Sequence, residues 1–490
     1  MTTSNNSNII AKVSIALILS CATLTVAVCQ TLPGNYTSTW AGNSYGQGLS
    51  PDRSSGKWVQ DLISDAVVGP EGYVYTAAHW DEGGRSAGVY GGKMVGGKEI
   101  GNVYGSLSTG SCVGETGKVG KEYTANGNAV AANSNNVYAV FNQNIYKYSL
   151  NGCQGSLFIA QNATALDATN EQLLVADGNN IKLFNLASKE KIAEFTVANT
   201  GPCAIAPNGD LWVISGLKIG DYHARKNSFW LKASAANPVI KRYSASGTFI
   251  EDIVNPSGTD LWWPTDIAFS NNGQLMVADA GYRRQILYFD TVSTNLVNTF
   301  GQEGGIAAGT KGVMATDKFY GQMQCGMDKY GNTFVICEGM GGNIRKFDTA
   351  MAHVWDLWGL GFVESGDADL YTDGLDIYTS NEHYKMDFST KELGQEWSHY
   401  AYTLDRIAYP NDPRVTSWIT SGIIRNLNGT RILFTYGMYG GAMNYFKFDD
   451  EIAVHVGSFD PGTWAAMPDD SANIWYIKQN QVWKKPFEGF

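Results

Sequence analysis

One pattern recurs along most of the chain: an apolar strand, a polar turn, a second apolar strand, a Gly/Asn break, and a third strand ending in an aromatic residue. The clearest copy is TDIAFSNNGQLMVADAGYRRQILYFD (265–290), with its turn at Asn272-Gly273 and its break at Ala280-Gly281. Copies recur about every 40 residues, the period of four-stranded units in radial arrays. A β-sandwich would not repeat its turn and its break in step. The sequence therefore predicts an all-β fold, a β-propeller of four-stranded blades.

Two copies carry a family resemblance. The segments PTDIAFSNNGQLMVADAGYRRQILYFD and ALDATNEQLLVADGNNIKLFN resemble NHL repeats, and about six clear NHL-like units lie within residues 63–359. Residues 360–490 repeat more loosely and supply two or three further units. The chain is also similar to uncharacterised secreted NHL-type proteins. This resemblance implies the propeller fold and no particular activity.

The number of domains follows from the lack of an obvious linker. No Pro/Ser-rich segment interrupts the repeats, so we expect residues 30–490 to form one propeller domain. The strand TSTWAGNSYG (37–46) resembles the outer strand of a blade. We expect it to close the ring by joining the C-terminal blade, because closure pairs sheet edges that would otherwise promote aggregation.

The N-terminus has the pattern of an export signal. Lys12 precedes an apolar, uncharged run over residues 13–28, which is short for a membrane-spanning helix. Small residues then precede Gln30, as signal peptidase requires. We predict a signal peptide over residues 1–29 and a secreted protein, with a signal anchor as the alternative. No later segment is apolar enough to span a bilayer, so no membrane span is expected after signal removal.

The charge and the cysteines restrict the partners and the chemistry. A net charge of -11 argues against nucleic-acid binding and suits neutral glycans, cations or basic proteins.

No C-x-x-C motif occurs, which disfavours a zinc site. Cys325 and Cys337 flank the turn DKYGN, and an oxidising compartment favours a disulfide between them, with buried free thiols as the alternative. Sequons predict glycosylation at Asn35, Asn162 and Asn428.

The densest polar and aromatic cluster lies after the second strand of the first blade, on the face where such loops gather. It contains His79, Trp80, Asp81, Glu82 and Arg85. Trp80 could stack on a sugar ring, while Asp81 and Glu82 accept hydroxyl hydrogen bonds or act as acid and base. The alternative is a loop acid paired with Arg85 and a Trp80 packed between blades.

A second cluster is Glu382-His383-Tyr384. His383 could act as a general base or a metal ligand, which makes His79, Asp81, Glu82 and His383 the candidate catalytic residues. A lone histidine is more often structural, and no motif supports a transition metal. The same face is expected to contribute ligand-binding residues, namely Trp80, Arg85, Asp279, Arg283, Glu382, Tyr436 and Tyr439.

Two aspartates occupy equivalent positions in two blades. Asp177 and Asp279 could hold Ca²⁺ through oxygen ligands. The stronger interpretation is that each caps its turn by accepting backbone N–H bonds. Ca²⁺ is the only cofactor that the sequence suggests. Its motif is incomplete, because the Glu and Asn spacing of a gluconolactonase-type calcium cage is absent.

These features predict a secreted β-propeller that binds an extracellular ligand, a glycan, on its loop face. One alternative is a hydrolase or lyase acting on glycan or ester substrates from the same face. The other is a scaffold for protein partners.

Overall fold

The structure is a computed structural model. It describes residues 59, 63–77, 87–105, 129–150, 155–218, 232–233, 238–256, 261–339, 341–360, 366–386, 389, 397–416, 419–437, 442–460 and 466–487. These residues form eight four-stranded antiparallel sheets, one three-stranded sheet and a short two-stranded hairpin. No helix of the described residues is long and apolar enough to cross a membrane.

Six of the four-stranded sheets come from the first three quarters of the chain. Their strands are β1–β4 (Asp65–Val68, Val74–Ala77, Ala87–Val95, Lys98–Gly105), β5–β8 (Val130–Ala132, Asn136–Phe141, Asn144–Ser149, Ser156–Ile159), β9–β12 (Ala165–Ala168, Gln172–Asp177, Asn180–Asn185, Lys191–Thr196), β13, β14, β17 and β18 (Thr200–Ile205, Leu211–Ser215, Val239–Tyr243, Phe249–Ile253), β19–β22 (Pro264–Phe269, Leu275–Asp279, Gln285–Phe289, Leu296–Phe300) and β23–β26 (Gln322–Met327, Thr333–Glu338, Gly341–Phe347, His353–Leu360). The hairpin β15–β16 (Leu217–Lys218, Lys232–Ala233) lies outside the fourth sheet.

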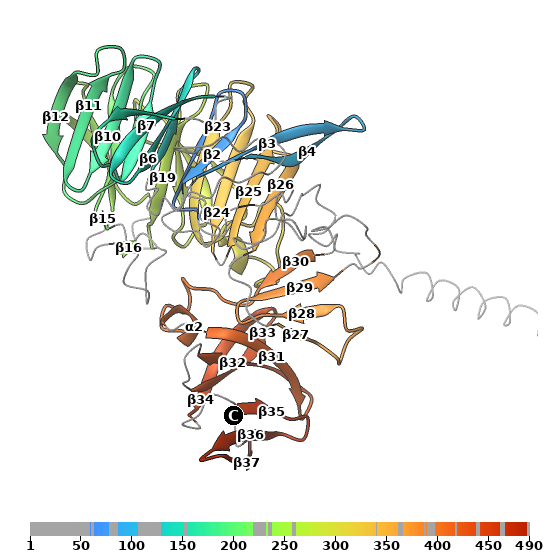
Figure 1. The fold of residues 1–490 in the computed structure, drawn as a ribbon. Helices are drawn as coiled ribbons and strands as arrows, with labels where there is room; N and C mark the ends of the chain where they lie inside the picture. Colours follow the sequence, from blue (N-terminus) through green and yellow to red (C-terminus); the bar gives the residue numbers. More distant parts are fainter. Residues whose placement is uncertain are drawn as a thin grey trace, which may run out of the picture.

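The first strands of these six sheets follow one another around a circle. In the order β1, β5, β9, β13, β19 and β23, each strand lies beside the next, and β23 lies beside β1. Apolar clusters fill the space between neighbouring sheets; Ala66 and Val74 of the first sheet pack with Ile336 and Trp355 of the sixth. This arrangement is a six-bladed β-propeller (Figure 1), and the predicted all-β propeller fold is confirmed.

The turn between the first two strands explains why the repeat is visible in the sequence. In four blades this turn carries a glycine with left-handed backbone: Gly72 (φ 80°), Gly209 (φ 87°), Gly273 (φ 79°) and Gly331 (φ 85°). Glycine adopts this conformation without the steric cost of a Cβ. In these four copies the sequence therefore marks the turn with a glycine at the same position.

The remaining strands form a second region, the C-terminal stack, which lies beyond the ring in Figure 1. Its sheets are β27–β30 (Asp367–Ala368, Asp376–Tyr378, Glu382–Met386, Trp397–Tyr402), β31–β34 (Ile419–Leu427, Thr430–Gly437, Met443–Asp449, Ile452–Phe459) and β35–β37 (Ala466–Pro468, Asn473–Lys478, Gln481–Pro486), with the short helix α2 (Pro413–Thr416). The first sheet contacts the second through β27 and β31. The third packs on the second through Ala466 and Ile474.

The looser repeats therefore form sheets, as predicted, but the expectation of one ring that includes them needs correction. Because β1 already lies beside β23, the circle is complete with six blades and has no gap for a seventh. The proposed closing strand, residues 37–46, lies outside the described residues, as do the signal peptide and Asn35.

The stack attaches to the fifth and sixth blades. Arg284 in the fifth blade forms a buried ion pair with Asp405 of the stack (2.6 Å). The segment between β22 and β23, which includes the 3-10 helix η2 (Gly305–Ala307), adds a backbone hydrogen bond from Met314 N–H to the Tyr400 carbonyl (3.0 Å). The two regions thus share a contact that is both polar and buried.

The expected disulfide is not formed. Cys325 and Cys337 are both free and buried in one apolar cluster, and so is Cys203 in another. In the β23–β24 ladder Cys325 lies opposite Val335, and Cys337 lies opposite Met323. The two thiols are therefore diagonal neighbours, and diagonal pairs are too far apart for an unstrained disulfide.

Candidate functional site

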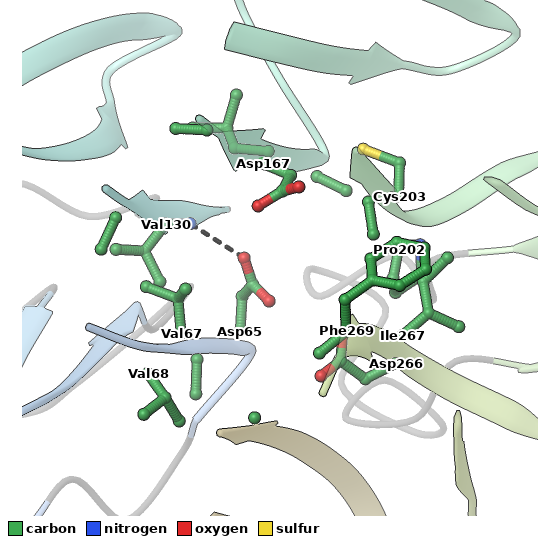
Figure 2. Close-up of a pocket in the computed structure, with 18 of the residues that line it drawn as sticks. Asp65, Val67, Val68, Val130, Asp167, Pro202, Cys203, Asp266, Ile267 and Phe269 are labelled. Atoms are coloured by element: carbon green, nitrogen blue, oxygen red, sulfur yellow. Dashed lines mark hydrogen bonds between the residues drawn. The ribbon is translucent and has the colours of Figure 1, made fainter. Parts of the chain in front are cut away.

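A cavity of about 210 Å³ lies at the centre of the propeller. The first strand of every blade lines it, as the close-up in Figure 2 illustrates. The lining reaches the ends of these strands at Val68, Phe269 and Met327, where the short turns to the second strands begin. The cavity therefore lies in the half of the central channel nearer these turns, away from the long loops of the opposite face.

Three aspartates from alternate blades line this cavity (Figure 2): Asp65, Asp167 and Asp266. Each Oδ2 accepts a hydrogen bond from a backbone N–H of the next blade's first strand. The donors are Val130 for Asp65 (2.8 Å), Ile205 for Asp167 (2.7 Å) and Cys325 for Asp266 (2.9 Å). The same contact thus repeats three times around the ring and ties the blades in pairs.

Burial makes these carboxyl groups hard to ionise. Loss of hydration is the main cause in each case, and it raises the pKa of Asp65 to about 7 and that of Asp167 to about 6. The pKa of Asp266 is raised well above its ordinary value by burial and then by the charge of Asp65. Backbone N–H bonds oppose these shifts only in part.

No cation balances the three carboxyl groups among the described residues. None of them forms an ion pair there, and no cluster of His, Cys, Asp and Glu in the described part of the chain could hold a metal ion. Gln324 occupies the position in the sixth blade that corresponds to Asp266 in the fifth, three residues before the end of the strand. Its buried amide has no hydrogen-bond partner within the described residues. The sixth blade thus carries a buried polar side chain at the position where the fifth blade carries Asp266.

Sequence reasoning missed this site, although a signal exists. The three aspartates lie in the first strand of alternate copies, in the segments ISDAVV, TALDAT and PTDIAF. An acid that recurs in a strand otherwise built of apolar residues is unusual, because a buried carboxyl group costs free energy unless it is hydrogen-bonded. Only the ring, however, shows that the three side chains face one cavity.

Most of the predicted loop-face cluster cannot be placed. His79, Trp80, Asp81, Glu82, Arg85 and Tyr439 lie outside the described residues. Their predicted roles in catalysis and ligand binding stay predictions.

Asp279 and Arg283 lie together, but the carboxyl group is buried. Asp279 Oδ1 accepts hydrogen bonds from the N–H groups of Trp263 (3.0 Å) and Gly281 (2.9 Å), and Arg283 lies 3.8 Å from Oδ2. This is the turn-capping arrangement considered as the alternative to a calcium ligand. In the equivalent position Asp177 accepts a hydrogen bond from the Gln161 side chain (3.0 Å).

His383 is held by carboxylates on both sides. Its Nδ1 lies 3.0 Å from Glu451 Oε2, its Nε2 lies 2.6 Å from Asp376 Oδ1, and its ring stacks on Tyr378. Both contacts are hydrogen bonds only when both nitrogens carry a proton. The hydrogen bond to His383 lowers the pKa of Asp376 to about 2, against the effect of burial, and contributes to the lowered pKa of Glu451. Both ring nitrogens contact carboxylates, so the geometry does not favour the predicted general base.

The remaining predicted residues of the stack are also enclosed. Glu382 is buried and accepts a hydrogen bond from the Tyr384 hydroxyl (2.6 Å); burial raises its pKa to about 8. Tyr436 is half-buried and packs in the cluster between the second and third sheets of the stack, where burial raises its pKa. Neither side chain presents an open binding surface.

The two sequons within the described residues differ in access. Asn428 is exposed in the turn between β31 and β32. Asn162 is half-buried, and its side-chain oxygen has no hydrogen-bond partner within the described residues. Glycosylation at each of them stays a prediction.

Two solved structures have a distant likeness to this chain. No protein-family model and no curated protein matches the chain. One similar solved structure is a protein of unknown function from Bacteroides caccae, with 13% identity and a TM-score of 0.33, covering 47% of this chain and 81% of that one. Another is the β-propeller domain of Cps50 (Swd1) from Myceliophteria thermophila, with 10% identity and a TM-score of 0.31, covering 71% of this chain and 91% of that one. The NHL resemblance therefore stays a prediction, while the ring of six blades identifies a β-propeller with an acidic central channel.

Proposed function

We propose that this protein is an extracellular ligand-binding propeller whose central channel receives a polyhydroxylated group, the end of a glycan. The observation that carries the proposal is the set of three carboxyl groups that face one cavity without a cation among the described residues. Export and the glycan as ligand come from the signal peptide pattern and the composition of the sequence.

The donor and acceptor capacity of the carboxyl groups suits sugar hydroxyl groups as partners. A sugar hydroxyl both donates and accepts hydrogen bonds. Carboxyl groups whose pKa lies at 6 or 7 are present in both protonated and ionised forms near neutral pH, so the set can both donate to a ligand and accept from it. This pairing would also remove the repulsion between neighbouring carboxylates.

The dimensions of the cavity suit one ring. A protein cavity of about 150 Å³ holds a benzene molecule, so about 210 Å³ can hold a group of the size of a single sugar ring. Phe269 adds an apolar surface to the lining. Aromatic faces beside hydroxyl-bonding groups are typical of sugar sites.

The alternatives receive less support from the described residues. A hydrolase or lyase that uses His383 would need a free ring nitrogen, and both nitrogens contact carboxylates. A scaffold for proteins does not require carboxyl groups inside a narrow channel.

The test is calorimetric titration of the mature chain with a panel of neutral mono- and disaccharides at pH 6. The variant Asp266→Asn keeps an oxygen that accepts the Cys325 N–H bond, so the blades stay joined while the acid is lost. We expect it to weaken sugar binding about fivefold to tenfold, since one hydrogen bond contributes about 1 kcal/mol. The matched control Asp252→Asn alters a carboxylate on the outer strand β18 and should leave the affinity unchanged.

Calcium chloride and an alkylammonium salt are titrated in parallel. Binding of either cation with the same dependence on Asp266, and no binding of sugars, would replace the glycan proposal with a cation site. Sugar binding that Asp266→Asn does not affect would show that the sugar site lies outside the channel.

A further inference from the structure

The cavity at the centre of the ring has acidic side chains on its described wall and no basic one. Its lining includes Asp65, Asp167 and Asp266, together with Cys203 and Cys325, and no Lys, Arg or His among the described residues. Burial raises the pKa of both thiols, so they stay uncharged near neutral pH. Any charge that forms on this described wall is therefore negative.

The three carboxyl groups have acceptor capacity that the described residues do not use. Each accepts hydrogen bonds from backbone N–H groups only, that of the next blade and that of the following residue in its own strand. A carboxylate has about four acceptor sites, so these donors leave about half of them open. Asp266 is only 7% exposed, and open acceptor sites in so buried a group favour a ligand that donates hydrogen bonds.

The carboxyl groups reach the cavity from different sides. Asp65 lies on β1, Asp167 on β9 and Asp266 on β19, which are the first strands of alternate blades (Figure 2). A ligand that contacts all three therefore needs donors on several sides. A sugar ring has them, because hydroxyl groups surround it, and the cavity of about 210 Å³ admits one such ring.

A neutral sugar leaves the charge of this site unbalanced. Burial raises the pKa of Asp266, and the charges of Asp65 and Asp167 raise it further, so the ionised forms repel one another. A cation on the ligand reverses this effect, because an opposite charge at close range favours the ionised form. The attraction is strong in a cavity that little water enters. A positive group attached to a sugar ring therefore matches both the charge and the size of the site.

We infer that the channel selects a glycan end that carries a free primary amino group, a hexosamine without its acetyl group. The ammonium group pairs with the carboxylates, while the hydroxyl groups donate to the acceptor sites that remain. The inference rests on the function proposed above and names the substrate class of the same site. An N-acetylated hexosamine fits less well, because acetylation removes the positive charge and adds volume.

The test is calorimetric titration of the full mature chain at pH 6 with glucosamine, N-acetylglucosamine, glucose and ethylammonium chloride. We expect glucosamine to bind at least tenfold more tightly than each of the other three, because it alone combines the charge with the hydroxyl groups. Glucosamine binding should also release protons, since the ammonium group favours ionised carboxyl groups. Its heat should therefore depend on the ionisation enthalpy of the buffer, whereas the heat of glucose binding should not.

The matched variants remove one carboxyl group inside the channel and one outside it. Asp65→Asn keeps an oxygen that accepts the Val130 N–H bond, and it should lower the ratio of glucosamine affinity to glucose affinity at least threefold. Asp252→Asn on the outer strand β18 should leave this ratio unchanged. Because the ratio compares two ligands on one protein, a loss of folded protein does not alter it.

The outcomes separate this inference from the function on which it rests. Equal affinity for glucosamine, N-acetylglucosamine and glucose would overturn the inference and leave a neutral glycan as the ligand. Ethylammonium binding as tight as that of glucosamine, without binding of glucose, would overturn both, because the site would then recognise any primary amine, a lysine side chain included. A ratio that Asp65→Asn leaves unchanged would show that the channel carboxyl groups do not recognise the amino group.

Discussion

The propeller and the C-terminal stack are built from the same antiparallel sheets, yet they differ in how the series of sheets ends. In the ring every sheet packs between two others, because the sixth blade meets the first. In the stack the first sheet meets the ring and the last leaves one face exposed. A closed series hides all its faces, whereas a linear series keeps a free end that is open to a partner or to aggregation.

The two regions also treat buried charge differently. The carboxyl groups of the channel have no cation within the described residues, and burial raises their pKa. In the stack Asp376 and Glu451 contact His383, and Asp412 pairs with Arg414, whereas Glu382 is buried beside the Tyr384 hydroxyl. Three of these four carboxyl groups of the stack thus have a basic partner, while the three acids around the cavity of the ring have none within the described residues.

The largest expected effect is a loss of stability in the stack that leaves the stability of the ring unchanged. Arg414 is fully buried, pairs with Asp412 (2.8 Å), and donates to the carbonyls of Ser380 and Thr403. Arg414→Met should destabilise the stack by about 3–5 kcal/mol, since it leaves a buried carboxylate and carbonyls unpaired. Hydrogen exchange followed by mass spectrometry should show lost protection in β31–β34 and unchanged protection in β9–β12.

The control for this experiment is Lys191→Met, which removes an exposed ion pair with Glu194 in the third blade. It should change stability by less than about 0.5 kcal/mol. Equal loss of protection in both regions of Arg414→Met would show that ring and stack unfold as one unit.

A smaller effect is expected where the regions meet. The Arg284–Asp405 pair is buried on both sides, so Arg284→Met should cost about 2–4 kcal/mol by leaving Asp405 without its cation. The double variant Arg284→Met/Asp405→Leu should recover part of this loss, because no unpaired charge remains. Urea unfolding of the two single variants and the double variant measures the coupling; additive losses would mean that the pair does not join the regions.

The third prediction uses pH to separate the regions. The pKa of Asp65 rises from 3.8 to about 7 and that of Asp167 to about 6, so their contribution to ring stability is complete below about pH 4 and is lost as pH rises through 6 to 7. The pKa of Asp376 falls to about 2, so its contribution to the stack is complete above about pH 4 and is lost as pH falls through 2. The ring should thus weaken in base and the stack in acid.

The measurement compares urea unfolding at pH 5 and pH 8. Because about 1.4 kcal/mol corresponds to one pKa unit, and water in the cavity offsets part of the burial, we expect the wild-type ring to lose on the order of 1–2 kcal/mol between these values. Asp65→Asn should reduce this loss. A pH response that Asp65→Asn leaves unaltered would assign it to other groups.

The smallest effect tests the free end of the stack. Val482 is largely exposed, so Val482→Ser should change the free energy of unfolding by less than about 0.5 kcal/mol. Ile474 lies on the opposite face of the same sheet and is buried, so Ile474→Ala should cost about 2–4 kcal/mol. Thermal unfolding of both variants checks the contrast, and a large loss for Val482→Ser would show that something covers the outer face.

The sequence alone was sufficient for the repeating unit of the ring. Turn glycines such as Gly273, and the alternation of apolar residues around them, are local features that act within a few residues. The same reasoning led to one error, because it predicted a disulfide between Cys325 and Cys337, which are near in the hairpin but diagonal in the ladder.

What the sequence by itself determined is therefore local: the strands, their turns, and six clear copies of one blade followed by looser sheets. Only the tertiary structure decided that the ring closes with six blades, because closure depends on contacts between β1 and β23, which are more than 200 residues apart. The same holds for the channel, where Asp65, Asp167 and Asp266 meet although about 100 residues separate each from the next. It holds also for the Glu451 that engages His383. Periodicity specifies what each segment becomes, while burial and pairing between distant segments decide which side chains meet and with what charge.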